Sequence, residues 1–147
     1  MKSKAVFLAI ALAGLVAGAV TAADEPQAVR QELMKKIGAS TGALAAIAKG
    51  EKPYDAAVVT ASLQTISENS KAFPDQFPAG SETGLETEAS PKIWENMDDF
   101  RAKSVKLATD VDAVLAQLPA DQAAVGAALG VIGKDCASCH ENYRIKK

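Results

Sequence analysis

The sequence predicts an all-α fold, an antiparallel four-helix bundle, on three observations. Apolar residues recur at helical spacings of three and four in four segments. Two short turns and one longer connection, marked by glycine and proline, separate these segments. Only 5% of the residues are aromatic, which disfavours a β-sandwich or barrel. A chain of 147 residues is long enough for one domain with a single core.

The first 23 residues are predicted to be a cleaved signal peptide that does not belong to the fold. Lys2 and Lys4 precede an uncharged run at residues 5–20, and small residues follow it where a signal peptidase would cut. A membrane anchor is less favoured, because the run is shorter than the roughly 20 residues that span a bilayer. We therefore expect residues 24–147 to form an exported domain, located in the periplasm, with no membrane span.

The first two helices are predicted at residues 24–50 and from Tyr54 to about Ala72. Gly50 is a plausible end for the first helix, and Pro53 cannot continue it. Asp55 is expected in the first turn of the second helix. The apolar stripe of the first helix is Val29, Leu33, Met34, Ile37, Leu44 and Ile47.

Two further helices are predicted after an irregular connection at residues 73–90, which is rich in proline and glycine. The third begins at Ser90–Pro91, a capping residue followed by proline, and continues without a break to Pro119. The last runs from about Ala120 to Arg144. The buried stripe of the third helix is expected to be Ile93, Met97, Phe100, Leu107, Val111, Val114 and Leu118.

Charge and composition argue against several classes of function. A pI near 5.4 without a lysine or arginine block disfavours nucleic acid as a partner. Two cysteines cannot build a disulfide-dense scaffold, and one histidine cannot build a multi-histidine metal cluster. An enzyme is not expected, since no second histidine is available for acid–base work and no carboxylate pair marks a substrate site.

The strongest motif is Cys-Ala-Ser-Cys-His at residues 136–140, the C-x-x-C-H signature of covalent haem c attachment. Two thiols one helical turn apart can each add to a haem vinyl group, and His140 then faces the iron as an axial ligand. The alternatives are weaker, because a thioredoxin-type motif follows a strand and a zinc site needs more ligands. A structural disulfide between Cys136 and Cys139 would leave His140 unexplained. No methionine follows His140, so a second axial ligand must come from upstream.

The whole mature chain resembles the class II cytochromes c, whose best-known members are the cytochromes c prime. The resemblance rests on RQELMK, KGEKPYDAA, FPAGSETG, SPKIWENMDDF and CASCHENYR, in this order and spacing. It implies a periplasmic four-helix bundle that binds one haem c and its iron, usually as a homodimer. It also implies electron transfer with a periplasmic redox partner protein, or binding of nitric oxide or carbon monoxide.

The residue opposite His140 separates these two functions in the family. In cytochromes c prime the sixth position is open, capped by an apolar side chain, and binds gas ligands. In the low-spin members a methionine of the first helix ligates the iron, and Met34 holds the matching position. We predict electron transfer with Met34 as ligand, because KGEKPYD and SPKIW resemble the low-spin members. The alternatives are a five-coordinate haem that traps gas, with Met34 only blocking the site, and a Met34 that only packs in the core.

Haem contacts are expected at four more residues. The resemblance matches Arg30 to an arginine that approaches a haem propionate, the alternative being a solvated arginine. It also implies that Arg144 lies beside the proximal face, the alternative being a cation that only complements the helix C-terminus. Trp94 and Tyr143 are expected to pack next to the haem. Lysines that could guide a redox partner are Lys134, Lys146 and Lys147.

A homodimer is also predicted from apolar residues on more than one face of the first two helices. Leu44 and Ile47 accompany Val29 on the first helix, and Val58 accompanies Val59 on the second. A monomeric bundle would hide fewer of these side chains, and the family packs its dimers through these helices.

Overall fold

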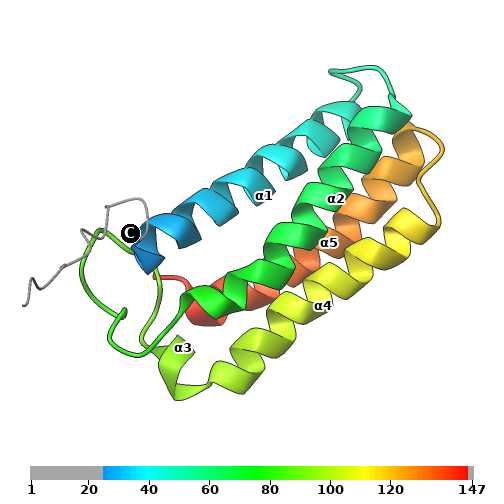
Figure 1. Cartoon of the computed structure of the whole chain (residues 1–147). Helices are drawn as coiled ribbons and strands as arrows, with labels where there is room; N and C mark the ends of the chain where they lie inside the picture. The colour runs from blue at the N-terminus through cyan, green and yellow to red at the C-terminus, as the bar shows by residue number, and fades with distance from the viewer. Residues whose placement is uncertain (1–24, 146–147) are drawn as a thin grey trace, which may run out of the picture.

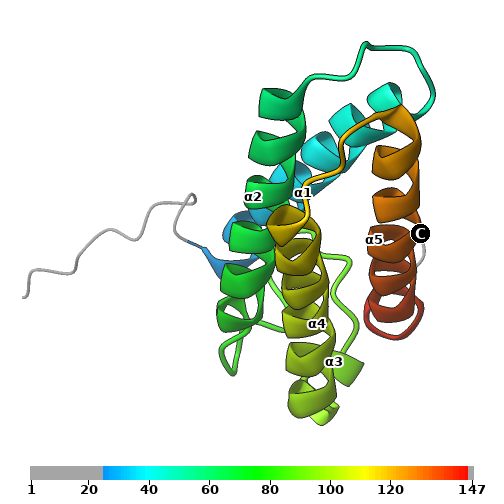
Figure 2. The ribbon, with the colours of Figure 1, turned by 90° about the vertical axis from the view of Figure 1, so that its right-hand side faces the viewer.

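The computed structural model describes residues 25–145, which form an antiparallel bundle of four long helices (Figures 1 and 2). The predicted signal peptide, Lys146 and Lys147 lie outside the described residues. No helix in the described part of the chain is long and apolar enough to cross a membrane. The elements are α1 (Pro26–Ala48), α2 (Ala56–Ala72), the 3-10 turn η1 (Phe73–Gln76), α3 (Lys92–Glu95), α4 (Met97–Ala116) and α5 (Gln122–Tyr143).

Aspartate caps begin two of the long helices. Asp55 Oδ1 accepts hydrogen bonds from the backbone N–H groups of Ala57 and Val58 at 2.8 and 3.2 Å, and Asp121 Oδ1 accepts one from Ala124 at 2.8 Å. Each carboxylate therefore satisfies N–H groups that have no partner within the helix. The sequence analysis expected Asp55 inside the first turn, but the structure places it, like Asp121, one residue before its helix.

The prediction of one unbroken third helix is wrong, because the chain breaks at Asn96 into α3 and α4. Asn96 has φ −136° and ψ 54°, outside the helical region, and separates the two helices. Asp98 and Asp99 follow in the first turn of α4, where negative charge favours a helix N-terminus. The backbone of Asn96 ends α3 and begins α4. Its N–H donates to the Lys92 carbonyl, and its carbonyl accepts from the Phe100 N–H, both at 3.0 Å.

The interior divides into two hydrophobic clusters, which we call the aliphatic cluster and the aromatic cluster. Short turns connect the long helices at the end of the bundle opposite α3 (Figure 1). The buried residues of the aliphatic cluster are Ile37, Leu44, Ile47, Val59, Leu63, Ile66, Leu107, Val111, Val125 and Ile132. Those of the aromatic cluster are Phe73, Phe77, Ile93, Phe100 and Tyr143. Since Ile93 lies in α3 and Tyr143 ends α5, the aromatic cluster is at the α3 end.

Burial within the bundle corrects the argument that predicted a dimer. Leu44 and Ile47 are 1% and 2% exposed and belong to the aliphatic cluster, so they do not form a second apolar face. Val59 is fully buried, whereas Val58 on the same helix is 42% exposed. Of the predicted stripe on the third helix, Leu118 is at the surface with 36% exposure. Val58 is thus the residue of that argument that remains clearly exposed.

A strap between the long loop and the end of α5 fixes the last turn of the bundle. The Ser90 N–H donates to the Tyr143 carbonyl at 2.9 Å, and the Ile145 N–H donates to the Glu88 carbonyl at 2.7 Å. Arg144 Nε adds a hydrogen bond of 2.6 Å to Glu88 Oε2. The C-terminal end of α5, which carries the C-x-x-C-H motif, is therefore held by main-chain and side-chain bonds together.

Candidate functional site

The C-x-x-C-H motif occupies the second half of α5, where helical geometry places its two thiols one turn apart on one side. Both cysteines are free and half-buried. Cys136 packs against the aliphatic cluster, and Cys139 packs against the aromatic cluster. The two thiols therefore lie on either side of the boundary between the clusters.

The electrostatics of the thiols differ from those of a redox-active dithiol. Burial raises the pKa of Cys136, with the negative charge of Asp135 acting in the same direction. Burial also raises the pKa of Cys139 to about 11. Thioredoxin-type cysteines require a lowered pKa to react as thiolates, so this site does not fit that chemistry. Protonated thiols suit addition to a vinyl group, in which the S–H bond supplies both sulfur and hydrogen.

His140 is on the last turn of α5, and its side chain is exposed. Partial desolvation by the surrounding chain lowers the pKa of His140, the positive charge of Arg144 lowers it further, and the negative charge of Glu88 opposes this. A lowered pKa favours the neutral imidazole, which is the form that binds a metal. No group of three or more metal-ligating side chains occurs within residues 25–145, so a metal ion held only by such a cluster is not supported there.

Tyr143 connects the end of α5 to α4. Its hydroxyl donates to Asp99 Oδ2 at 2.6 Å, and its ring meets the Phe100 ring edge-on at 5.4 Å. The hydrogen bond to Asp99 and burial raise the pKa of Tyr143 to about 12, so the hydroxyl stays protonated at neutral pH. Tyr143 is a buried member of the aromatic cluster, and its packing next to the haem stays a prediction.

Met34 on α1 is the side chain that joins the two clusters, since it packs against both of them. Cys136 and Cys139 contact the same two clusters from α5, and α1 is a neighbour of α5 in the bundle (Figure 2). The structure thus places Met34 and the thiols around one boundary. Met97, at the start of α4, packs only against the aromatic cluster.

Arg30 lies one turn before Met34 and is 4% exposed, which is unusual for a charged side chain. Its Nε donates to the Gln76 carbonyl at 2.7 Å, and its guanidinium carbon lies 4.3 Å from the Phe77 ring centre and 5.5 Å from that of Trp94. Burial lowers the pKa of Arg30, and the charge of Glu82 opposes this effect. Nη1 is buried without a hydrogen-bond partner among the described residues. An open donor on a buried cation fits a ligand that carries a carboxylate.

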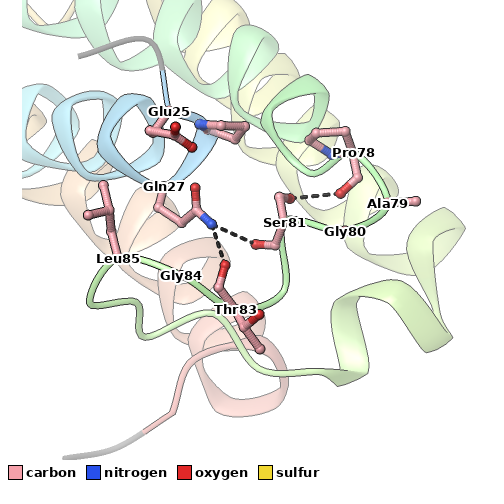
Figure 3. Close-up of a pocket in the computed structure, with 10 residues that line it drawn as sticks. Glu25, Gln27, Pro78, Ala79, Gly80, Ser81, Thr83, Gly84 and Leu85 are labelled. Carbon is pink, nitrogen blue, oxygen red and sulfur yellow. Dashed lines mark hydrogen bonds between the residues drawn. The ribbon is translucent and has the colours of Figure 1, made fainter. Parts of the chain in front are cut away.

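Gln27, Ser81, Phe77 and Asp99 are contacts of this region that the sequence analysis did not single out. Gln27 and Ser81 are both buried and hold the loop after η1 against α1. That loop and the start of α1 also form the wall of an open cavity of about 710 Å³ (Figure 3). The two cysteines and His140 are not part of this wall. The sequence contains FPAGSETG as a recognisable segment, but no spacing rule identifies which of its residues contacts α1.

Two features together test whether these residues fit a haem. The half-buried thiols are free and spaced by one turn beside a histidine, which is the donor set for covalent attachment through two thioethers. The partnerless Nη1 of Arg30 supplies a buried donor for a carboxylate, and haem carries two. An all-helical bundle with this motif defines the class of protein as a c-type cytochrome of the four-helix type.

Comparison with known proteins identifies the family. The cytochrome c' family model matches residues 25–144, so the chain belongs to this family, the class II cytochromes c. A cytochrome c-556 of Agrobacterium fabrum is 59% identical over 147 residues, covering 100% of this chain and 99% of that protein. A cytochrome c' of Rhodopseudomonas palustris is 40% identical over 139 residues, covering 92% and 94%.

Solved structures agree with the fold. The structure of cytochrome c' from Rhodopseudomonas palustris matches with a TM-score of 0.79 at 40% identity, covering 84% of this chain and 98% of that one. A structure of oxidised cytochrome c556 from the same organism matches with a TM-score of 0.76 at 37% identity, covering 84% and 98%. The protein is therefore a mono-haem class II cytochrome with covalently attached haem c as its cofactor.

Proposed function

We propose that this cytochrome carries single electrons between periplasmic redox partners, with the haem iron six-coordinate. When bound, haem c supplies a one-electron ferric–ferrous couple. Cys136 and Cys139 would hold it through thioethers, and His140 and Met34 would ligate its iron. Arg30 would bind a haem carboxylate through Nη1, and Arg144 would lie near His140.

The single observation that carries this proposal is the position of Met34 at the boundary of the two clusters. Cys136 contacts one cluster and Cys139 the other, so a group attached to both thiols extends along this boundary. Met34 packs against both clusters from the neighbouring helix. A thioether in this place supplies a soft ligand that stabilises ferrous iron and raises the reduction potential.

Relatives at the higher identities are named cytochrome c-556 rather than cytochrome c'. Four proteins named cytochrome c-556 from Agrobacterium are 58–62% identical to this chain. Proteins named cytochrome c' are 40% and 34% identical. The alternative function, a five-coordinate haem that binds nitric oxide or carbon monoxide for gas trapping or protection from nitrosative stress, is suggested by these more distant relatives.

Met34→Leu tests the proposal, with Met97→Leu as the matched control. Leucine keeps the apolar volume, so we expect each variant to lose less than about 1.5 kcal/mol of stability. The optical spectrum of the reduced wild type should be low-spin. Met34→Leu should convert it to high-spin, admit carbon monoxide immediately and lower the reduction potential, whereas Met97→Leu should leave all three unchanged.

Three results would argue against ligation by Met34. A wild type that is already high-spin would support the gas-binding function, with Met34 acting only as a cap over the site. A low-spin wild type that Met34→Leu does not change would require a different ligand. Parallel conversion by Met97→Leu would assign the effect to packing in the aromatic cluster.

Export and assembly complete the proposal. We assign residues 1–23 as a signal peptide and residues 24–147 as the mature periplasmic protein, on the charge and apolar pattern of the leader. A homodimer through α1 and α2 is supported by Val58, which remains exposed on α2. Gly38 and Gly42, exposed on one side of α1 with open space around them, would allow a second helix to approach closely.

A further inference from the structure

Ser81 is the buried centre of the contacts between α1 and the loop after η1. It is 6% exposed. Its hydroxyl donates to the Pro78 carbonyl at 2.7 Å and accepts from Arg30 Nη2 at 2.5 Å. Its carbonyl accepts a second hydrogen bond from the same Nη2 at 2.9 Å. Because Pro78 takes the one proton of the hydroxyl, the lone pairs of Oγ are directed to Arg30.

Gln27, about one helical turn before Arg30 on α1, holds the same loop. Its Nε2 donates to the carbonyls of Ser81 and Thr83 at 3.3 and 2.6 Å (Figure 3). The loop passes close to this amide only because residue 84 is glycine: φ is 122°, and a Cβ there would lie 2.9 Å from Gln27 Nε2. Gln27 and Arg30 thus hold the loop from one face of α1, so Ser81 cannot shift independently of them.

These contacts leave one nitrogen of the Arg30 guanidinium, Nη1, without a hydrogen-bond partner among the described residues. Nε and Nη2 are used by Gln76 and Ser81, and the faces of the guanidinium are covered by Phe77 and Trp94. A guanidinium is planar, so fixing Nε and Nη2 also fixes the direction of Nη1. The negative charge of Glu82, in the same loop, also acts on Arg30 and opposes the lowering of its pKa by burial.

We propose that Ser81 is a positioning residue that orients Arg30 toward the haem carboxylate and thereby raises the reduction potential of the haem. This rests on the proposed function, in which Arg30 binds that carboxylate. A fixed positive charge next to the haem favours the ferrous form, which carries one positive charge less than the ferric form. Loss of the Ser81 hydroxyl removes one of the three hydrogen bonds that hold the guanidinium, so its orientation is less fixed and its charge acts less on the haem.

A double-mutant cycle on the holoprotein tests this inference. The midpoint potential is measured at fixed pH and ionic strength for the wild type, Ser81→Ala, Arg30→Gln and the double variant. We expect Arg30→Gln to lower the potential and Ser81→Ala to lower it by a smaller amount. The double variant should have the potential of Arg30→Gln alone, since Ser81 then has no guanidinium to orient.

Matched controls separate orientation from folding. Ser81→Thr keeps the hydroxyl, and Ser81→Val has the volume of threonine but no hydroxyl. Ser81→Thr should therefore retain the wild-type potential, whereas Ser81→Val should resemble Ser81→Ala. This pair carries the test if Ser81→Ala does not fold. The backbone turn should survive in each, because the Ser81 N–H also donates to the Pro78 carbonyl, at 3.2 Å. Thr83→Ala, an exposed change in the same loop, should leave the potential unchanged.

The outcomes distinguish the inference from the proposed function. If Arg30→Gln lowers the potential but Ser81→Ala does not, or lowers it equally in both backgrounds, Ser81 does not act through Arg30 and the inference is overturned alone. If Arg30→Gln leaves the potential unchanged, the assignment of Arg30 to the haem carboxylate fails, and the inference fails with it. A potential for Ser81→Val equal to that of Ser81→Thr would also overturn it, since the hydroxyl would have no effect.

Discussion

Phe100 offers a quantitative test of the aromatic cluster, because it contacts most of the other rings. It is 1% exposed and lies on the first turns of α4. Its ring centre is 4.7 Å from that of Phe77, 5.4 Å from that of Tyr143 and 6.0 Å from that of Phe73. The Phe77 and Tyr143 contacts are edge-to-face, the arrangement that the ring quadrupoles favour.

The expected cost of removing this ring follows from these contacts. Phe100→Leu keeps much of the apolar volume but removes three ring pairs. The two edge-to-face pairs contribute about 0.5–1.5 kcal/mol each beyond burial, so the free energy of unfolding should fall by about 2 kcal/mol. Phe100→Ala also leaves a cavity and should cost about 4 kcal/mol.

Guanidinium unfolding of the holoprotein, combined with a double-mutant cycle, measures the ring contribution directly. Phe100→Leu combined with Phe77→Leu should show a coupling energy of about 0.5–1.5 kcal/mol, as expected for a close edge-to-face pair. Leu63→Ala provides the control, because Leu63 is equally buried but belongs to the aliphatic cluster. Its effect should add to that of Phe100→Leu within about 0.5 kcal/mol. A coupling below about 0.3 kcal/mol for the Phe100–Phe77 pair would refute the reasoning.

Two further predictions concern stability at high pH and assembly. The pKa of Tyr143 is raised to about 12 in the folded state, so the stability from its bond to Asp99 is complete below about pH 10 and is lost as the pH rises toward 12. Tyr143→Phe should lower the free energy of unfolding by about 1–2 kcal/mol at neutral pH and remove the loss of stability between pH 10 and 12. Unfolding of both proteins across this pH range measures the effect, and equal pH profiles would contradict it. The wild type should sediment as a dimer at micromolar concentration and Val58→Glu as a monomer, and a monomeric wild type would exclude the dimer.

Helical periodicity was sufficient to predict the bundle but not its interruption. The bounds of α1, α2 and α5 agree with the predicted segments within a few residues. The break at Asn96 was missed because Ile93, Met97 and Phe100 keep a helical spacing of four and three across it. A pattern of buried positions records which side chains face the core, and it does not record a local change of φ and ψ at an exposed residue.

Some residues of the candidate site can be predicted from the local sequence, whereas others depend on contacts between segments far apart in the chain. Cys136, Cys139 and His140 could be predicted as site residues from the sequence, because their chemistry depends on spacing within about one helical turn. Gln27 and Ser81 were not, because their contact joins residues 54 positions apart and its partner on the loop is a backbone carbonyl. Any residue type supplies such a carbonyl, so composition contains no signal for it.

The division of the interior into two clusters has a consequence for engineering this scaffold. Leu63, Val125 and the rest of the aliphatic cluster occupy the half of the bundle opposite α3, where the connecting turns are short. Substitutions there should shift the melting temperature while the visible absorption spectrum and the reduction potential of the protein stay constant. Changes to Phe77 or Trp94, which cover Arg30, should alter the reduction potential, and Phe77 changes should lower the stability as well, because Phe77 is also part of the buried aromatic cluster. Heat stability is therefore best engineered in the aliphatic half of the molecule, without touching the residues that surround Arg30.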